Sequence, residues 1–309
     1  MMQEFCHKLK NVITKGTVLT EEPMSRHTSF QIGGPAEIFV QPATGDEVRQ
    51  AICLAKEEQI PFFVVGNGSN LLVSDDGFRG TIVQIGRNLQ EISVEDNVIY
   101  AQAGALLSRV ARTALEHGLT GMEFAAGIPG SLGGAVAMNA GAYGGEMKDI
   151  LTDAEVLTPD GEIKILSLEE LDLSYRHSCI FDEDYIVLSV HLQLEQGDTT
   201  VIRNRMDELA RARREKQPLE YPSAGSTFKR PEGYFAGALI QDAGLKGYTV
   251  GGAQVSEKHS GFVINRGGAT AEEVLFLIKQ VQKKVKSRFG VTMEPEVRMV
   301  GFTDTEVKL

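Results

Sequence analysis

Apolar positions with helical spacing predict three amphipathic helices. Each carries a local boundary signal, because a Thr-x-x-Glu capping box satisfies free N–H groups at a helix start and glycine suits the left-handed residue beyond a helix end. The three helices follow the capping box at Thr44, span residues 106–116, and run from the capping box at Thr270 to Gly290. The last one ends in lysines and an arginine, which suits the negative end of the helix dipole.

Short runs rich in β-branched residues predict strands between these helices. The runs lie at residues 62–65, 81–85, 98–101, 155–157, 162–165 and 185–194, and a Thr-Pro-Asp-Gly turn separates the fourth from the fifth. Helices and strands alternate without a fixed repeat, so we expect an α+β fold. We place three parts at residues 1–80, 81–198 and 199–309.

The composition narrows the class of partner and the compartment. The 309 residues are 42% hydrophobic and 24% charged, with a formal net charge of −11, which disfavours nucleic acid as a partner. The three cysteines form no Cys-x-x-Cys pair, the first residues lack a signal-peptide pattern, and no apolar run is long enough to cross a membrane. We therefore expect a cytoplasmic protein without a membrane partner.

A first glycine-rich loop follows the predicted strand at residues 62–65. Missing side chains allow backbone N–H groups to surround an anion, and the loop residues Gly66, Asn67, Gly68, Ser69, Asn70 and Leu71 are candidates for cofactor binding. Leu71 occupies the place of the third glycine of a dinucleotide-binding fingerprint, and no Gly-Lys-Ser/Thr of a P-loop follows. Taken alone, the loop is as often a tight turn as a phosphate site.

A second loop holds seven glycines between residues 127 and 145. Close backbone packing would explain it, and a flexible linker fits less well because apolar residues lie between the glycines. A cradle for a diphosphate is the functional alternative. The candidates here are Gly127, Ile128, Pro129, Gly130, Ser131, Gly133, Gly134, Asn139 and Gly141. Two such loops in one chain favour a long dinucleotide over a single phosphate.

The pair of loops resembles the diphosphate-binding loops of the FAD-binding fold of the vanillyl-alcohol-oxidase (PCMH) type. The Arg-His-Thr-Ser-Phe-Gln-Ile-Gly-Gly-Pro-Ala segment at residues 26–36 is similar to the N-terminal signature of the UDP-N-acetylenolpyruvoylglucosamine reductase family, and the match continues to about residue 301. The resemblance implies two FAD-binding subdomains and a C-terminal α+β substrate domain. It also implies FAD as cofactor and NADPH as co-substrate.

The same resemblance implies the reaction and its residues. The family reduces UDP-N-acetylglucosamine enolpyruvate to UDP-N-acetylmuramate for peptidoglycan synthesis, and hence for cell shape and division. Its arginine, serine proton donor and glutamate match Arg176, Ser226 and Glu296. Its substrate-binding residues match Tyr175, Lys216, Lys229 and Arg298. Without the resemblance, Arg176 reads as a surface charge, Ser226 as a turn residue, and Glu296 with Arg298 as a neighbouring pair on one strand.

Several alternatives remain open on the residues alone. A flavin oxidase of the same fold, or a non-catalytic nucleotide-binding protein, would carry similar glycine loops. The short interval between Arg176 and Glu195 resembles the family form that lacks a tyrosine-bearing loop over the substrate. No metal is expected, because the six histidines are dispersed and no ligand cluster is seen. We expect a monomer.

Overall fold

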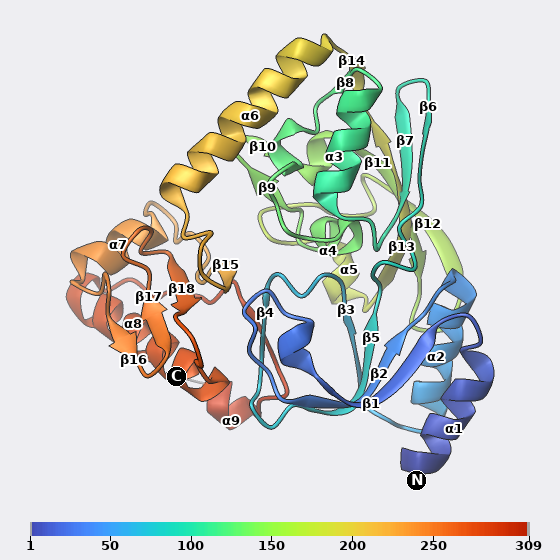
Figure 1. The fold of residues 1–309 in the computed structure, drawn as a ribbon, viewed down its shortest axis with the longest axis horizontal. Helices are drawn as coiled ribbons and strands as arrows, with labels where there is room; N and C mark the ends of the chain where they lie inside the picture. Colours follow the sequence, from blue (N-terminus) through green and yellow to red (C-terminus); the bar gives the residue numbers. More distant parts are fainter. Residues whose placement is uncertain (1, 308–309) are drawn as a thin grey trace. The chain divides into compact units, whose positions relative to one another are not determined.

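The structure is a computed structural model that describes residues 2–307. Helices and strands mix throughout, which confirms the α+β prediction (Figure 1). The chain forms two compact units. The first holds residues up to Thr20, Ile38–Asn67 and Gly80–Ala212, and the second holds Glu21–Glu37, Gly68–Arg79 and the chain from Arg213 onward. The first glycine loop is therefore divided between them, after Asn67.

A five-stranded antiparallel sheet is the centre of the first unit. Its order is β12 (Ile163–Ser167), β11 (Leu151–Leu157), β13 (Ile186–Gln193), β7 (Val98–Gln102) and β6 (Ile92–Glu95). The short helix α4 (Leu132–Ala137) lies within the second glycine loop and packs on β13 and β7. The buried faces are formed by aliphatic side chains such as Val190 and Ala101, which lie opposite each other in the register of β13 and β7.

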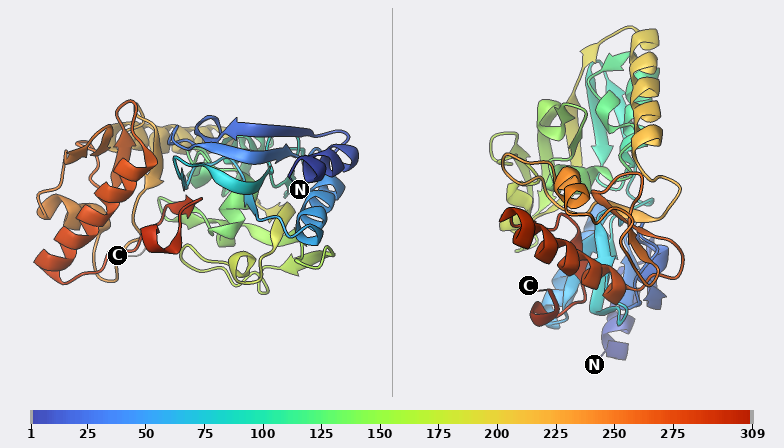
Figure 2. Two further views of the ribbon diagram at one scale, coloured as in Figure 1. Left: turned by 90° about the horizontal axis from the view of Figure 1, so that it is seen from below. Right: turned by 90° about the vertical axis from the view of Figure 1, so that its left-hand side faces the viewer.

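A second sheet has the order β1 (Thr17–Pro23), β2 (Pro35–Gln41), β5 (Phe78–Gln84) and β3 (Phe62–Val65). The β3–β5 pair is parallel. The helices α1 (Met2–Val12) and α2 (Gly45–Glu57) pack against each other, as Figure 2 also shows. The predicted cap is present in α2, where the Thr44 hydroxyl accepts the N–H of Glu47 at 3.1 Å. The first glycine loop begins where β3 ends.

The second unit is built on a four-stranded antiparallel sheet. Its order is β15 (Ser223–Ser226), β18 (Phe262–Asn265), β17 (Ala253–Val255) and β16 (Thr249–Val250). Helix α8 (Ala271–Phe289) packs on β16, β17 and α7 (Ala236–Asp242). A separate parallel pair joins β4 (Leu71–Val73) to β19 (Arg298–Val300), although more than two hundred residues lie between them in sequence.

The remaining elements are short apart from α6 (Thr199–Lys216), which contains the boundary between the units. They are η1 (Met24–Arg26), α3 (Leu107–Glu116), β8 (Leu119–Thr120), η2 (Glu123–Ala125), β9 (Gly141–Ala142), β10 (Gly145–Glu146), η3 (Met147–Asp149), α5 (Cys179–Asp182), β14 (Glu195–Gln196) and α9 (Asp304–Val307). Helix α3 confirms the helix predicted over residues 106–116.

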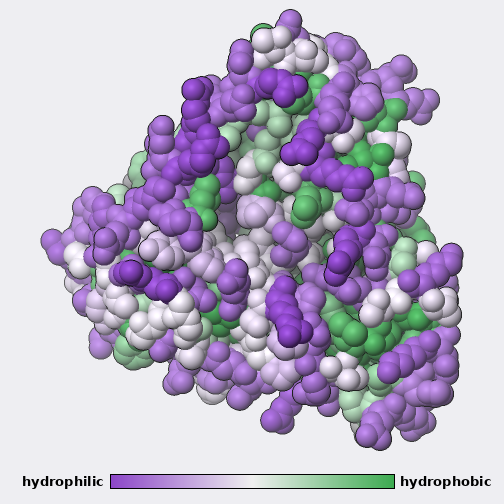
Figure 3. Space-filling view, viewed as in Figure 1, coloured by the Kyte–Doolittle hydropathy of each residue, from purple (hydrophilic) through white to green (hydrophobic). Residues whose placement is uncertain are grey.

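The face in Figure 3 is mainly hydrophilic, with scattered hydrophobic patches. Among the helices of the described residues, none is long and apolar enough to cross a bilayer. Within residues 2–307, no group of three or more histidine, cysteine, aspartate or glutamate side chains is placed to hold a metal ion.

The start of α8 depends on a carboxylate from a distant segment. Asp75 accepts the N–H groups of Ala271 at 2.8 Å and Glu272 at 3.0 Å. A carboxylate at a helix N-terminus satisfies free donors and interacts favourably with the helix dipole. Replacing Asp75 by alanine should lower the free energy of unfolding by about 1–2 kcal/mol. Chemical denaturation measures this, with Asp76→Ala as the exposed control that should change stability little.

Candidate functional site

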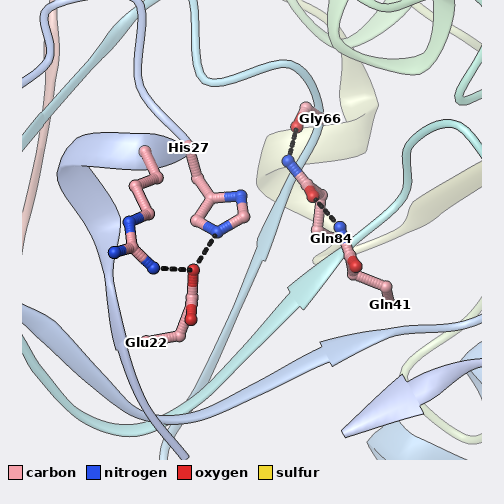
Figure 4. Close-up of polar contacts among 6 residues, drawn as sticks. Glu22, His27, Gln41, Gly66 and Gln84 are labelled. Carbon is pink, nitrogen blue, oxygen red and sulfur yellow. Dashed lines mark hydrogen bonds and ion pairs between the residues drawn. The ribbon is translucent and has the colours of Figure 1, made fainter. Parts of the chain in front are cut away.

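The two glycine loops touch within the first unit. The Asn67 side-chain amide donates to the Pro129 carbonyl at 2.6 Å. A Cβ added at Gly66 would overlap the Ser131 hydroxyl, so glycine at this position lets the loops approach. The Gly66 carbonyl accepts from the Gln84 amide at 3.1 Å, and Gln84 in turn accepts from Gln41 at 2.7 Å (Figure 4). The proximity that a shared ligand would require is present.

The first loop also exposes backbone donors. In the chain described from residue 2 to 307, the backbone N–H groups of Asn67, Gly68 and Ser69 have no protein acceptor. Gly68 adopts a left-handed φ of 63°, and a Cβ there would overlap the backbone carbonyl of His27. Unpaired N–H groups on such a turn form a nest that suits an anionic oxygen. This part of the loop fits a phosphate.

The second loop is an ordered segment fixed to the end of β7, so a flexible linker is excluded. The N–H of Leu132 donates to Ala105 at 2.8 Å, and that of Gly133 donates to Ala103 at 2.8 Å. A Cβ at Gly133 would lie 2.8 Å from that of Ala103, so close packing explains this glycine. Gly130 contributes its carbonyl to the N–H of Leu107. Backbone packing therefore accounts for some of these glycines.

Asn139 connects the end of the second loop to the segment that carries Arg176. Its side chain is buried, and its amide donates to the Glu146 carboxylate at 2.8 Å and to the Ser174 carbonyl at 3.1 Å. Its carbonyl oxygen accepts the N–H of Lys148 at 3.0 Å. Its φ of 40° lies in a region that asparagine tolerates better than most residues. Gly141 is tightly packed too, because a Cβ there would lie 2.8 Å from that of Glu146.

Replacing Asn139 by alanine should destabilise the first unit. The change removes three hydrogen bonds and leaves buried groups unsatisfied, for a loss of about 2–4 kcal/mol. It should also reduce activity, because the Ser174 carbonyl loses its support. Thermal unfolding and turnover check both effects. The exposed Asn88→Ala change serves as the control, and equal melting temperatures for the two variants would contradict the role given to Asn139.

Tyr175 and Arg176 form the corner of a tight turn. Ser174 and His177 exchange both backbone hydrogen bonds at 3.2 Å, and Arg176 takes a left-handed φ of 56°. Such a conformation costs about 1 kcal/mol or more for a residue with a side chain, and it is often found at functional sites. The Arg176 guanidinium lies 5.3 Å from the Tyr175 ring centroid. The turn therefore presents a cation together with an exposed aromatic ring.

The backbone segments that carry Ser226 and Glu296 are hydrogen-bonded to each other within the second unit. Ser226 ends β15, and the carbonyl of the following residue, Thr227, accepts the N–H of Glu296 at 2.8 Å. The Thr227 hydroxyl, buried in the sheet, accepts the N–H of Val263 at 3.0 Å. Gly225, with φ of 74°, provides the irregularity in the strand that precedes Ser226. Two of the three candidate catalytic groups are thus held by one backbone network.

Asn70 brings the first glycine loop to the same place. Its side-chain amide donates to the Glu296 carbonyl at 3.1 Å, and its own carbonyl accepts the N–H of Arg298 at 2.9 Å. Leu71 then starts the strand that pairs with β19. Desolvation of the guanidinium lowers the pKa of Arg298, although the residue as a whole is exposed, and the group remains a cation at neutral pH.

The two candidate lysines differ in their surroundings. Lys229 pairs with the Glu294 carboxylate at 2.5 Å, and its N–H donates to the Glu294 carbonyl at 2.9 Å. Both contacts hold Lys229 against the segment that also carries Glu296. Lys216 is the exposed last residue of α6. The structure thus groups Asn70, Ser226, Lys229, Glu296 and Arg298 in the second unit, and Tyr175 and Arg176 with the second loop in the first.

The structure explains the role of the family signature at residues 26–36, which the sequence alone did not reveal. The Ser29 N–H donates to the Gly68 carbonyl at 3.1 Å, and its hydroxyl donates to the Ser223 carbonyl at 2.7 Å. The Phe30 carbonyl accepts from the Asn265 amide at 3.2 Å. One short segment thus joins the first glycine loop to the strands that carry and flank Ser226. Nearby, His27 contacts Glu22 at 3.0 Å (Figure 4).

Comparison with known proteins identifies the family. Residues 36–167 match the FAD binding domain, and residues 217–300 match the C-terminal domain of UDP-N-acetylenolpyruvoylglucosamine reductase. Reductases of that name from Caldanaerobacter subterraneus subsp. tengcongensis and Agathobacter rectalis are each 54% identical and cover 97% of this chain and 99% of their own. The crystal structure of the Thermus caldophilus reductase matches with a TM-score of 0.79 at 35% identity, over 93% of this chain and 99% of that one. The chain therefore belongs to the UDP-N-acetylenolpyruvoylglucosamine reductase family.

Proposed function

We propose that this chain is an FAD-dependent enzyme that reduces UDP-N-acetylglucosamine enolpyruvate to UDP-N-acetylmuramate with NADPH, in peptidoglycan precursor synthesis. The observation that carries the proposal is the meeting of Asn70, Ser226 and Glu296 in one backbone network. This network connects the first glycine loop, which is of the phosphate-binding type, to the residues that carry the hydroxyl (Ser226) and the carboxylate (Glu296). The sequence identity of 54% to reductases of this name, over nearly the full length of both chains, supports the same reaction.

The glycine loops fit the diphosphate of FAD. The free N–H groups at residues 67–69 and the close contact between Gly66 and Ser131 provide donors without side chains in the way. Gly127–Gly134, Asn139 and Gly141 would complete the cofactor site on the other loop. When bound and reduced by NADPH, the flavin would supply a hydride to the terminal carbon of the enol ether. The protein must then hold the substrate and supply a proton.

The charged residues suit the negative charge that this reaction creates. Hydride addition places charge on the neighbouring carbon, and that charge spreads into the attached carboxylate. We assign Arg176 to stabilise this carboxylate and Glu296 to assist its positioning or protonation. Ser226 donates the proton to the neighbouring carbon, so that the carbon–carbon double bond becomes a single bond. A serine hydroxyl is a weak acid, and the charge already developed on the substrate makes the transfer favourable.

The remaining candidate residues would bind the nucleotide. Lys216, Lys229 and Arg298 provide cations for the diphosphate or carboxylate, and Tyr175 provides an aromatic surface. We further propose that residues 1–80 and 81–198 form the two cofactor subdomains and residues 199–309 the substrate domain. We also place the enzyme in the cytoplasm as a monomer. Size-exclusion chromatography with light scattering tests the last statement.

A visible spectrum tests the proposed function directly. The purified protein should be yellow, lose its flavin absorbance when NADPH is added under nitrogen, and regain it when the enolpyruvyl nucleotide follows. Acid precipitation should release the flavin, because no covalent link is expected. A colourless protein would overturn the proposal. Recovery of colour with oxygen and peroxide formation, but not with the nucleotide, would instead indicate a flavin oxidase.

A further inference from the structure

The turn between β17 and β18 is held by hydrogen bonds at both ends, one of them to the residue after Ser226. Its first residue, Ser256, is buried, and its hydroxyl accepts the N–H groups of Lys258 at 3.1 Å and His259 at 3.2 Å. At the other end, the Gly261 carbonyl accepts the N–H of Thr227 at 2.9 Å. The turn is thereby tied to the residue that follows Ser226. A side chain on it has a fixed position relative to the serine.

His259 lies on the same face of the sheet as Ser226. Ser226 and Phe262 are directly opposite in the antiparallel register, and side chains of such a pair point to the same side. The His259 ring packs edge-on against the Phe262 ring, with centroids 5.0 Å apart. The Phe262 ring, which lies opposite Ser226, is therefore the ring between the imidazole and Ser226. It is half-buried there.

The hydrogen bonds fix the form of this imidazole. The Gly261 N–H donates to Nδ1 of His259 at 3.1 Å, so Nδ1 is the acceptor and the ring proton sits on Nε2. Burial lowers the pKa of His259, which keeps the ring neutral. No acceptor for Nε2 is present in the part of the chain from residue 2 to 307. His259 thus offers one oriented N–H donor that does not depend on protonation at neutral pH.

We propose that the Nε2–H of His259 donates a hydrogen bond to an anionic oxygen of the substrate bound beside Ser226. The inference rests on the proposed function, which brings two anionic groups, a carboxylate and a diphosphate, to this face. A neutral donor suits this place because it adds no further cation beside Lys229 and Arg298. His259 is then a substrate-binding residue that the dispersed pattern of histidines in the sequence did not reveal.

Three variants test this assignment. His259→Phe keeps a planar ring against Phe262 but removes the donor, whereas His259→Gln keeps an N–H donor. Ser260→Ala is the matched control in the same turn, because its buried hydroxyl has no partner among the described residues. We expect His259→Phe to lower kcat/KM for the enolpyruvyl nucleotide about 10- to 100-fold, the loss typical of one hydrogen bond to a charged group. His259→Gln and Ser260→Ala should stay within about threefold of the parent.

The kinetic constants identify the oxygen. A fall in kcat at saturating nucleotide assigns the bond to the carboxylate, where charge increases during the reaction, and a rise in KM alone assigns it to the diphosphate. Melting temperatures and bound flavin should match across the variants. Equal kcat/KM for the Phe and Gln variants would overturn the inference, and so would loss in both. If the parent enzyme does not reduce the nucleotide at all, the proposed function fails instead.

Discussion

Replacing Ser226 by alanine should leave the reaction with NADPH nearly intact and reduce the rate of substrate reduction by a factor of about 10²–10⁴. The hydroxyl is the proposed proton source for the carbon next to the carboxylate, and proton donation is not needed when NADPH delivers hydride. The change removes one atom from a partly exposed strand end, while the backbone network through Thr227 and Glu296 stays in place. Rapid mixing under nitrogen measures the two half-reactions separately.

Ser223→Ala is the control for this variant. Ser223 begins the same strand, and the bond that it makes to Ser29 uses its backbone carbonyl, so the change should affect neither half-reaction. Equal losses in the two half-reactions of Ser226→Ala would contradict the role of proton donor and indicate a general disturbance of the site. A normal rate of substrate reduction would exclude Ser226 as the proton source.

Elements with local signals could be predicted from the sequence. The capping box at Thr270 and the cap at Gly290 are present in the structure. At Thr44 only half of the predicted box is present: the hydroxyl accepts the N–H of Glu47, but the Glu47 carboxylate accepts from Ala43, Lys15 and Gly16. Helix α6 is a different case, since only Ile202 and Leu209 are buried along its 18 residues and its apolar pattern is correspondingly weak. The basic residues in its last turn, Arg213, Arg214 and Lys216, are typical of a solvated helix face.

Contacts between distant segments could not be predicted from local patterns. The parallel pairing of Leu71 with Arg298 has no signal in either strand, because each is only three residues long. The residues of the candidate site came from the family resemblance, and the structure adds why Asn70, Ser226 and Glu296 belong together.

Replacing Gly68 by alanine should weaken FAD binding by about 100-fold or more. The new Cβ would overlap the backbone carbonyl of His27, which cannot rotate away, so the loop itself must shift. Overpacking of this kind costs about 1–3 kcal/mol, and a left-handed φ adds about 1–2 kcal/mol for a residue with a side chain. The shift would misplace the N–H groups of Asn67 and Ser69. Flavin content after purification and titration of the apoprotein with FAD measure the effect.

Two comparisons isolate the cause. Gly244 has a similar φ of 72° but no atom within 4 Å of an added Cβ, so Gly244→Ala carries the conformational cost alone and should bind FAD normally. Gly66→Ala meets the Ser131 side chain, with the hydroxyl as the nearest atom and Cβ at 3.3 Å, and the double variant with Ser131→Ala should recover part of the lost affinity, since the nearest obstructing atom is then absent. If Gly68→Ala retained its flavin as tightly as Gly244→Ala, the first loop would not be the place where the cofactor's phosphates bind.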